Sequence, residues 1–429
     1  PSAGVIAAAY IGKQCGADKI ITFDMGGTSA DISLIENYTP QVSNERYVEG
    51  YPARIPMINI ITIGAGGGSI AHIDNAGALK VGPESAGANP GPVAYNLGNE
   101  QPVVTDANLV LGRINPHYVL GGRLKIDAQL SRAAMKKQIA DPMGLSVEAA
   151  AQGVISVVNS NMARAIRVIT VEKGHNPSDF TLVAYGGAGP LHAVHLAQEM
   201  GIHTVLIPPA PGALCALGLL TADIKKSYVK TALIPYDQAT PEQINQAVLP
   251  LMEEGSRWLA SENVPEQRRQ FHNVAEMRYV GQNYELQVEI PAGLVDQADL
   301  DRMKEDFFRA HEMNYGYYNP NAPVQFVNFR SEAIGQVQKP RLAELTGHME
   351  TPSGAVIDHR DVYFEESGLV RCPVYDRSKF GRCPRVDGPC IVEQMDSTTV
   401  IPPNTWFEVD IHGNLIVNAF GDGKGGDEA

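Results

Sequence analysis

The hydrophobic pattern of the first 35 residues predicts a helix followed by two strands that meet at a glycine pair. The segment 5–14 is rich in alanine and aliphatic residues, which favours a helix. Aliphatic and aromatic residues at 20–23 build the first strand, and Gly26 and Gly27 interrupt it. Residues 32–35 resume the pattern with period-two alternation, so a strand–turn–strand unit is expected.

A second regular stretch lies in the middle of the chain. Ser146 is a helix N-cap residue, the helical pattern continues to Lys173, and Gly174 ends it. A strand, a glycine-rich turn, a helix and a further strand then follow at residues 180–185, 186–190, 191–200 and 204–207. This β-turn-α-β order is typical of an α/β sheet with a parallel pair of strands.

A region rich in glycine, proline and alanine separates these two stretches. It covers residues 50–122 and contains short β patterns at 58–63 and 70–73. Because isoleucine, valine and leucine recur between the glycines, the region is interpreted as ordered rather than as a loose loop. We expect a Gly/Pro-rich inserted β subdomain over about residues 40–125.

The pattern changes again after about residue 234. Amphipathic helices are expected at 240–262 and 299–315, on either side of a strand pair near 275–290. From residue 354 onward short strands alternate with turns. The expected parts are an ATPase-like domain, an α+β domain, a β-rich C-terminal domain and a disordered tail, over residues 1–234, 235–345, 346–420 and 421–429.

Composition and charge exclude several kinds of partner. Hydrophobic residues make up 44% of the 429 residues and charged residues 19%, as in ordinary soluble enzymes. The net charge of −14 argues against nucleic acid and against an anionic membrane. The most apolar helical stretch, 153–171, is interrupted by polar residues, and no signal peptide is seen. The five cysteines are scattered, which argues against a zinc or disulfide framework and favours the cytoplasm.

The first candidate site is the turn between the two N-terminal strands. Its glycines allow several backbone N–H groups to point at one anion, and its hydroxyls can donate to phosphate oxygens. Magnesium is usually held by one or two carboxylates together with phosphates, so the flanking acids are candidate catalytic and metal-binding groups. The candidate residues are Asp24 and Asp31 as catalytic acids, Asp24 also as a Mg²⁺ ligand, and Gly26, Gly27, Thr28 and Ser29 for nucleotide binding. A plain β-hairpin with a Gly-Gly turn is the alternative.

A second glycine turn supports the nucleotide interpretation. It lies between a strand and a helix, where backbone amides at a helix N-terminus form an anion site. Its candidate nucleotide-binding residues are Gly186, Gly187, Ala188 and Gly189. His192 stands where the dinucleotide fingerprint needs a third glycine, and the first turn lacks the lysine and helix of a P-loop. The arrangement is instead that of the actin/Hsp70/sugar-kinase ATPase fold.

Longer stretches of the chain resemble the hydantoinase A/5-oxoprolinase family. The matching segments are ITFDMGGTSADISLI (21–35), ITIGAGGGSIAHID (61–74), VGPESAGANPGPVAY (81–95), VVTDANLVLGRINP (103–116), VAYGGAGPLHA (183–193), RYVGQNYEL (278–286) and GPCIVEQMDSTTVIPP (388–403). The resemblance implies an ATPase fold, ATP with Mg²⁺ or Mn²⁺ as cofactors, a small-molecule substrate and a B-type partner subunit. It implies that ATP phosphorylates an oxygen of the substrate, which turns a poor leaving group into a good one.

The resemblance implies two functions, and the missing N-terminal domain adds a third hypothesis. The first is a subunit of an ATP-dependent hydrolase of cyclic amides such as hydantoins or 5-oxoproline. The second is a subunit of an ATP-dependent carboxylase of ketones such as acetone or acetophenone. The third is a truncated, non-catalytic nucleotide-binding or assembly module. The family normally has an N-terminal domain with its own phosphate turn, which is absent here, so the chain is expected to own one half of the cleft and, alone, to hydrolyse ATP poorly.

Other residues have both a functional and a structural interpretation. Asp106 is a candidate metal ligand or a helix-capping acid. His192 and His195, one helical turn apart, with His175 and His203 nearby in sequence, could hold a metal, although packing histidines are the default. The glycine clusters at 64–68, followed by Ser69, and at 82–91 either line a substrate or phosphate path or serve as packing turns. Cys215 is a buried apolar residue or a nucleophile, and Arg278 and Gln282 are candidates for contact with a partner subunit.

Overall fold

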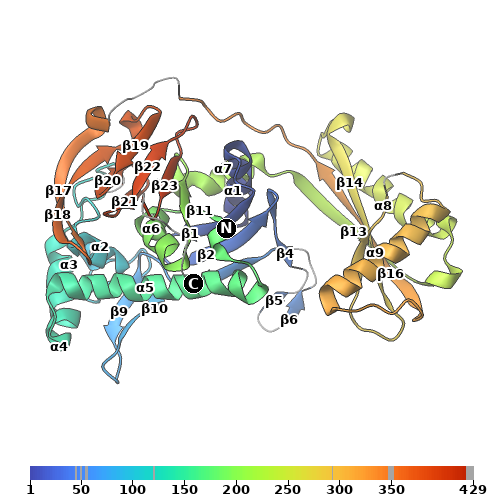
Figure 1. The fold of residues 1–429 in the computed structure, drawn as a ribbon, viewed down its shortest axis with the longest axis horizontal. Coiled ribbons are helices and arrows are strands. Elements are labelled where there is room, and N and C mark those ends of the chain that lie inside the picture. Colours follow the sequence, from blue (N-terminus) through green and yellow to red (C-terminus); the bar gives the residue numbers. More distant parts are fainter. Residues whose placement is uncertain are drawn as a thin grey trace. The chain divides into compact units, whose positions relative to one another are not determined.

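The computed structural model describes residues 1–43, 46–48, 51–53, 57–118, 121–291, 293–345 and 352–421. It consists of two compact units (Figure 1). The first unit combines residues Pro1–Thr221 with Pro340–Ala429, and the second is Ala222–Lys339. The expected disordered tail, 421–429, lies outside the described residues except for Gly421.

The first unit is built on a mixed sheet, in which nine strands pair within the described residues. The strand order is β19-β22-β23-β12-β11-β1-β2-β3, and β8 also pairs with β2. The strands are β1 (Lys19–Met25), β2 (Ala30–Glu36), β3 (Thr39–Pro40), β8 (Ile60–Ile63), β11 (Thr181–Tyr185), β12 (Thr204–Ile207), β19 (Cys383–Asp387), β22 (Trp406–Val409) and β23 (Leu415–Asn418). β1, β11 and β12 are parallel and β1 pairs with β2 in an antiparallel hairpin, which confirms the strand–turn–strand unit and the parallel pair.

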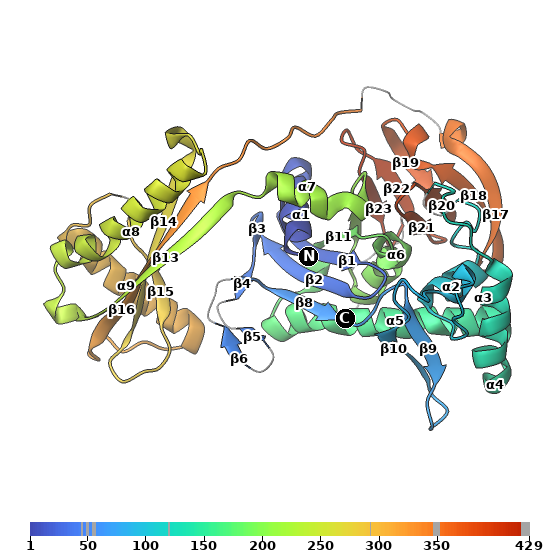
Figure 2. The same cartoon turned by 180° about the vertical axis from the view of Figure 1, so that it is seen from behind.

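Helices cover both faces of this sheet (Figures 1 and 2). The covering helices are α1 (Ser2–Cys15) and α7 (Leu214–Thr221) on one face, and α5 (Val147–Ile169) and α6 (Gly189–Met200) on the other. Because side chains alternate along a strand, Ile21 and Phe23 pack toward α5 and α6, while Ile20 packs toward α1. Both faces of the central strands are therefore buried.

The long helix α5 is the core helix of this unit. Ser146 caps it by accepting a hydrogen bond from Ala149 N (3.1 Å), and the chain leaves it through a 3₁₀ turn, Val171–Lys173, that ends at Gly174. The stretch Val147–Lys173 is long and apolar enough to cross a membrane, but over half of its most apolar part is buried within the protein. Its apolar side chains are thus used in packing against the sheet.

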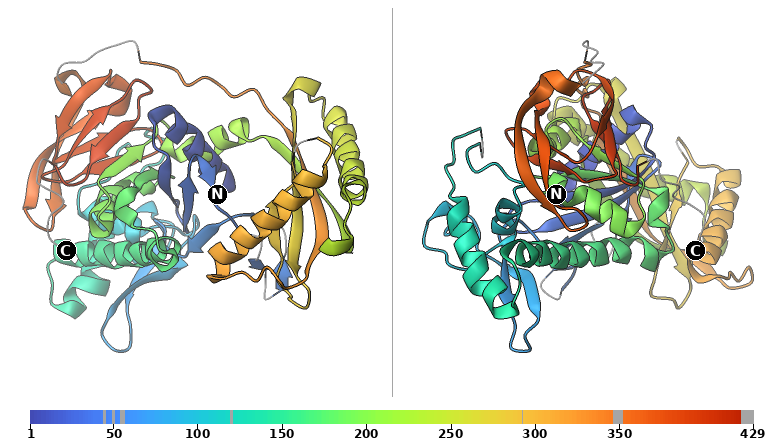
Figure 3. Two further views of the ribbon diagram at one scale, coloured as in Figure 1. Left: turned by 45° about the vertical axis from the view of Figure 1, so that its right-hand side comes forward. Right: turned by 60° about the vertical axis from the view of Figure 1, so that its left-hand side comes forward.

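Smaller elements complete the first unit (Figure 3). The inserted Gly/Pro-rich region contributes β4 (Val42–Ser43), β5 (Arg46–Val48), β6 (Tyr51–Ala53), β7 (Met57–Ile58), β9 (Ser69–Ile73), β10 (Leu79–Ser85) and α2 (Val104–Val110). α3 (Ala128–Met135) and α4 (Asp141–Met143) follow. A second, four-stranded sheet has the order β17-β18-β20-β21, with β17 (Val356–Phe364), β18 (Gly368–Asp376), β20 (Cys390–Glu393) and β21 (Thr398–Ile401). The C-terminal strands expected from the sequence are present.

The second unit is a four-stranded antiparallel sheet covered by two helices. Its strand order is β13-β16-β14-β15, and a core of large apolar residues lies between sheet and helices. The elements are β13 (Ile224–Pro235), α8 (Pro241–Ser261), β14 (Arg269–Tyr279), β15 (Leu286–Glu289), α9 (Gln297–Tyr315) and β16 (Val324–Gly335). The amphipathic pattern located both helices correctly, whereas β13 and β16 were not predicted.

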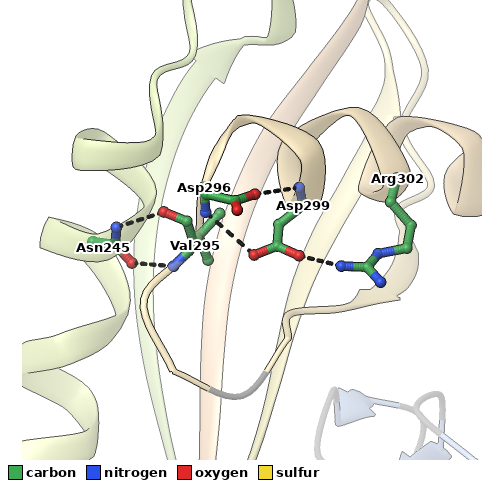
Figure 4. A network of polar contacts seen from close by, with 5 residues as sticks. All are labelled: Asn245, Val295, Asp296, Asp299 and Arg302. Atoms are coloured by element: carbon green, nitrogen blue, oxygen red, sulfur yellow. Dashed lines mark hydrogen bonds and ion pairs between the residues drawn. The ribbon is translucent and has the colours of Figure 1, made fainter.

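A polar network fixes the start of α9 in this unit (Figure 4). Asp296 accepts a hydrogen bond from Asp299 N (2.9 Å), and Asp299 accepts one from Asp296 N (3.2 Å), which forms a reciprocal capping box. Arg302 pairs with the Asp299 carboxylate. Asn245 on α8 bonds both the amide and the carbonyl of Val295, at 2.9 and 3.0 Å. The two helices are therefore joined just before α9 begins.

The boundaries of the compact units along the chain differ from those of the domains expected from the sequence. The expected divisions lie at 234/235 and 345/346, whereas the units divide at 221/222 and 339/340. The N- and C-terminal segments form one unit because β23 pairs with β12. The first boundary lies before residue 234 because β13 pairs with β16 and so belongs to the second unit. The three-domain division remains a proposal about which segments fold independently.

Candidate nucleotide site

The tip of the β1–β2 hairpin is open on one side. Gly26 N donates to Ser29 O (3.1 Å), which closes the turn, and Gly27 and Thr28 are exposed. A Cβ placed on Gly26 or Gly27 would meet no atom within 4 Å. The amides of Gly27 and Thr28 have no hydrogen-bond acceptor among the residues that the structure describes. The turn thus offers two unused N–H donors.

The opposite side of the tip packs against the glycine cluster at residues 64–68. Gly67 N donates to Gly26 O (3.0 Å) and Gly68 N to Gly27 O (2.6 Å). Because N–H and C=O of a trans peptide point in opposite directions, the Gly27 and Thr28 N–H groups point away from this cluster. A Cβ on Gly66 would lie 2.6 Å from Gly27 C, so only glycine permits this approach. The cluster is therefore a packing support that aims the hairpin amides.

Two carboxylates face each other beside the tip. Asp24 and Asp31 are direct cross-strand partners in the β1–β2 ladder, so their side chains lie on the same face. Asp24 Oδ2 accepts a weak hydrogen bond from the Cys215 thiol (3.5 Å), whereas Asp31 Oδ1 accepts a short one from Thr62 Oγ1 (2.5 Å). Neither acid forms an ion pair with a described lysine, arginine or histidine. Burial raises the pKa of Asp24, the Cys215 hydrogen bond opposes the rise, and the Asp31 charge adds to it.

This pair fits a magnesium ion that arrives with phosphate. Like charges directly opposite each other destabilise a ladder unless a cation lies between them. The part of the chain that the structure describes holds no group of three or more His, Cys, Asp or Glu residues arranged for a metal. Magnesium needs no such cage, because it is usually bound by one or two carboxylates, phosphate oxygens and water. The donor set at Asp24 and Asp31 is thus of the right kind.

The second glycine turn packs directly against the hairpin. Asp24 is paired in register with Tyr185, the last residue of β11, so both turns leave the sheet at the same edge. Ala188 N donates to Met25 O (2.9 Å). Gly186 has a φ of +79°, and a Cβ there would lie 2.5 Å from Asp24 Oδ1. Gly187 is exposed just before α6 begins, so the structure brings the two predicted turns together.

Three residues at this edge were not identified as site residues from the sequence. Asp396 accepts hydrogen bonds from Gly212 N (2.8 Å) and from Gln394 Nε2 (2.6 Å). Its carbonyl oxygen lies 3.6 Å from the position that a Cβ on Gly187 would take. The C-terminal segment thus closes one side of the second turn. For Asp396 and Gln394, the only signal in the sequence was that they lie in the stretch 388–403 that resembles the family.

Asp106 has a structural place. It is fully buried, and its carboxylate accepts hydrogen bonds from Val93 N, Ala94 N and Val103 N, each at 3.0 Å, and from Ser131 Oγ at 2.6 Å. Val103 is the N-cap residue of α2 and Asp106 is the third residue of this helix, so Asp106 caps the helix by accepting from the Val103 amide and is not itself the N-cap residue. We do not propose it as a metal ligand, because both of its oxygens are already occupied.

The histidines on α6 are packing residues. His192 is fully buried, with Nδ1 2.8 Å from Asn159 Oδ1 and Nε2 3.5 Å from Asn108 Nδ2. Burial lowers the pKa of His192 to about 3 and that of His195 to about 4, so both rings are neutral near pH 7. No third ligand joins them among the described residues.

The other predicted residues have side-chain contacts of their own. His175 lies 3.6 Å from Glu36, and His203 contacts the Phe420 ring. Arg278, in the second unit, pairs with Glu285 at 2.8 Å. Contact of Arg278 and Gln282 with a partner subunit remains a prediction.

Comparison with known proteins gives matches over nearly the whole chain. Models described as "Hydantoinase/oxoprolinase" and "Hydantoinase/oxoprolinase C-terminal domain" match residues 1–228 and 236–418. The caprolactamase subunit alpha of Pseudomonas jessenii is 37% identical over 96% of this chain and 60% of its own length. The acetophenone carboxylase gamma subunit of Aromatoleum aromaticum is 32% identical over 98% of this chain and 59% of its own. The chain thus spans about 60% of the length of these relatives.

A solved structure shares the fold. The nucleotide-free structure of an ATP-dependent acetone carboxylase superposes with a TM-score of 0.86 at 29% identity, over 97% of this chain and 60% of that chain. This likeness confirms the predicted α/β, ATPase-like fold with its C-terminal β-rich region.

Proposed function

Because the chain belongs to the hydantoinase/oxoprolinase family, we propose that it forms one half of the ATP-binding cleft of an ATP-dependent hydrolase of cyclic amides. The single observation that carries the proposal is the edge of the sheet where two glycine turns and the facing Asp24 and Asp31 meet. Unused amides lie beside two carboxylates that form no ion pair with a described lysine, arginine or histidine, which is the donor set that a magnesium-bound triphosphate needs.

In this proposal the chain's own groups bind and orient ATP. The Gly27 and Thr28 amides donate to phosphate oxygens, and the amides at the start of α6 do the same from the second turn. Asp24 and Asp31 hold a divalent cation, Mg²⁺ or Mn²⁺, through oxygen ligands or its waters. When bound, the cation neutralises charge on the phosphates. The terminal phosphoryl group would then pass from ATP to the amide oxygen of the substrate, with ADP as the leaving group. Water would attack the ring carbon, phosphate would leave, and the ring C–N bond would break.

The cyclic amide is favoured over the ketone by similarity. The caprolactamase subunit is 37% identical to this chain and the acetophenone carboxylase subunit 32%. A ketone carboxylase remains the second candidate, because the fold superposes on an acetone carboxylase. The names of these relatives call them subunits, so a B-type partner subunit is part of the proposal. A cytoplasmic location, expected from the scattered cysteines, is also part of it.

The test is ATP hydrolysis by the assembled enzyme with each substrate class. ADP release should rise on addition of a lactam, a hydantoin or 5-oxoproline and stay at its basal rate with ketone plus bicarbonate. The reverse pattern would favour the carboxylase. ATP binding without turnover under every condition would favour the non-catalytic assembly module.

A further inference from the structure

The thiol of Cys215 contacts one of the two candidate metal-binding acids. Cys215 lies in α7, 191 positions after Asp24, and its Sγ donates to Asp24 Oδ2 at 3.5 Å. Among the residues that the structure describes, no other group donates a hydrogen bond to this carboxylate. The orientation of the Asp24 side chain therefore depends on one donor, from a helix that is distant in the sequence.

Close packing of α1 on α7 holds the thiol in this place (Figure 1). A Cβ on Gly4 of α1 would lie 3.0 Å from Cys215 Sγ, so the sulfur occupies space that a side chain at Gly4 would need. A Cβ on Gly218 of α7 would lie 1.7 Å from Ala3 O, so the backbones of the two helices are in direct contact. Because α1 lies this close, the sulfur has little room to turn toward it, and the thiol faces Asp24 instead.

A neutral thiol suits a carboxylate that must bind a cation. The terminal torsion of an aspartate has a broad energy minimum, so a carboxylate without a donor samples many orientations. Each carboxylate oxygen has two acceptor sites, so Asp24 Oδ2 can accept from the thiol and still contact a metal ion. A lysine or arginine in the place of Cys215 would compete with the metal ion for the negative charge. The thiol can select an orientation without this competition.

A second thiol–aspartate pair in the same unit has the same distance but a different importance. Cys15 Sγ donates to Asp410 Oδ2, also at 3.5 Å. The Asp410 carboxylate accepts three further hydrogen bonds, from His412 N and Asn414 N at 2.8 Å and from Asn414 Nδ2 at 2.7 Å. Loss of the Cys15 thiol would therefore leave Asp410 in place, whereas Asp24 has no such additional donors among the described residues.

We propose that Cys215 is a positioning residue of the candidate nucleotide site, and that its thiol fixes the Asp24 carboxylate in the orientation that a divalent cation needs. The inference rests on the proposed function, in which Asp24 is a ligand of Mg²⁺ or Mn²⁺. Loss of a residue that orients a metal ligand typically lowers metal affinity by about 10- to 100-fold, and a weak thiol donor belongs at the lower end of this range. Cys215 itself stays neutral and forms no bond to substrate or phosphate.

The experiment compares binding of ADP with Mn²⁺ and of metal-free ADP to the assembled enzyme by calorimetry, and also measures the Mg²⁺ dependence of ADP release. Cys215→Ala should weaken binding of ADP with Mn²⁺ by about tenfold and leave metal-free ADP binding unchanged. The half-saturating Mg²⁺ concentration should rise to the same extent, while kcat at saturating Mg²⁺ changes by less than about twofold. Cys215→Ser retains a donor and should bind within about threefold of the wild-type enzyme. The matched control is Cys15→Ala, which removes a bond of the same kind and should change none of these quantities.

The variants separate a positioning role from a purely structural one. Normal binding of ADP with Mn²⁺ by Cys215→Ala, or equal losses in Cys215→Ala and Cys215→Ser, would overturn the positioning role and leave the candidate site standing. A lower kcat with an unchanged Mg²⁺ requirement would also overturn it, because this pattern indicates a structural role. The same loss in Cys15→Ala would do so too, since it would show that any thiol of this unit matters equally.

Two further measurements complete the test. Capping the thiols of the folded enzyme with methyl methanethiosulfonate, confirmed at Cys215 by mass spectrometry, removes the donor without any refolding. Unchanged affinity for ADP with Mn²⁺ after capping would overturn the positioning role even if Cys215→Ala did not fold. Failure of the wild-type enzyme to bind ADP in either form would instead overturn the nucleotide site and, with it, the positioning role.

Discussion

Two pairs of aspartates, one in each unit, show how differently the same residue type can be used. Asp296 and Asp299 in the second unit accept hydrogen bonds from each other's backbone amides, and Arg302 pairs with Asp299 (Figure 4). Asp24 and Asp31 in the first unit face each other across a ladder. Among the described residues, their side-chain hydrogen-bond partners are the Cys215 thiol and the Thr62 hydroxyl.

The difference separates acids that stabilise from acids that are available for a ligand. A carboxylate that caps a helix stabilises the fold by about 1 kcal/mol. A pair of facing carboxylates without a cation costs stability, and the fold tolerates this where a ligand later supplies the positive charge. The comparison predicts that mutations in the two pairs have opposite effects on stability and on nucleotide binding.

The largest effect is expected from Asp24→Asn combined with Asp31→Asn. Loss of both carboxylates should lower kcat/KM for ATP by about 100-fold or more, because the divalent cation loses its protein ligands. The melting temperature should stay the same or rise. ADP release and thermal melting measure the two quantities. Activity close to that of the wild-type enzyme would contradict the assignment of these acids.

A backbone test of the same edge is Gly186→Ala. The new Cβ would overlap Met25 O and Asp24 Oδ1 at a φ of +79°, so the free energy of unfolding should fall by about 2 kcal/mol or more. Urea unfolding measures it. Gly316→Ala in the second unit is the control, because its φ is +78° and its Cβ would meet open space. A similar loss in both variants would show that the positive φ alone, without close packing, sets the cost.

The capping pair of the second unit gives the next smaller effect. Asp296→Ala removes the acceptor for Asp299 N, so the second unit should lose about 1 kcal/mol of stability. ATP binding and turnover should be unchanged. Chemical unfolding together with calorimetry would check both, and a change in nucleotide affinity would mean that the two aspartate pairs are not separate in function.

The smallest effect is a pH dependence of the Asp24→Asn variant. Because the folded state raises the pKa of Asp24 above 3.8, the wild-type protein loses stability as pH rises through the interval between 3.8 and that raised pKa. Asparagine does not titrate. The stability gained by Asp24→Asn should therefore vanish below pH 3.8, grow through the interval and level off above it. Melting curves of both proteins across this pH range measure the difference in stability. A difference that does not change with pH would contradict the raised pKa of Asp24.

Local patterns predicted much of the fold. The β1–β2 hairpin, the β11–α6–β12 unit, α8, α9 and strands β20 to β23 follow from periodicity and glycine position. β13 was missed because most of its residues are exposed, so apolar alternation is weak. β16 was missed although its residues alternate between buried and partly buried, which is a signal that the sequence did contain.

The candidate site was only half visible in the sequence. Asp24, Asp31 and the glycines of both turns are marked by local motifs, because a tight turn needs those residues next to each other. The contacts of Cys215 with Asp24 and of Asp396 with Gly212 join residues separated by 191 and 184 positions. Periodicity carries no information about such pairs, which depend on how sheets assemble. For Asp106 the sequence left a metal ligand and a helix-capping acid open, and its bond to Val103 N agrees with the capping alternative.

The pairing of β23 with β12 has a consequence for the order of events during synthesis. Thr204 lies opposite Asn418, so more than 200 residues must be translated before this edge of the sheet is covered. The wall of the second turn, at Asp396, also emerges from the ribosome late. Until these strands emerge, the nascent chain exposes an unpaired strand edge beside the candidate site. The candidate site can therefore be completed only after β23 has been synthesised and has paired with β12.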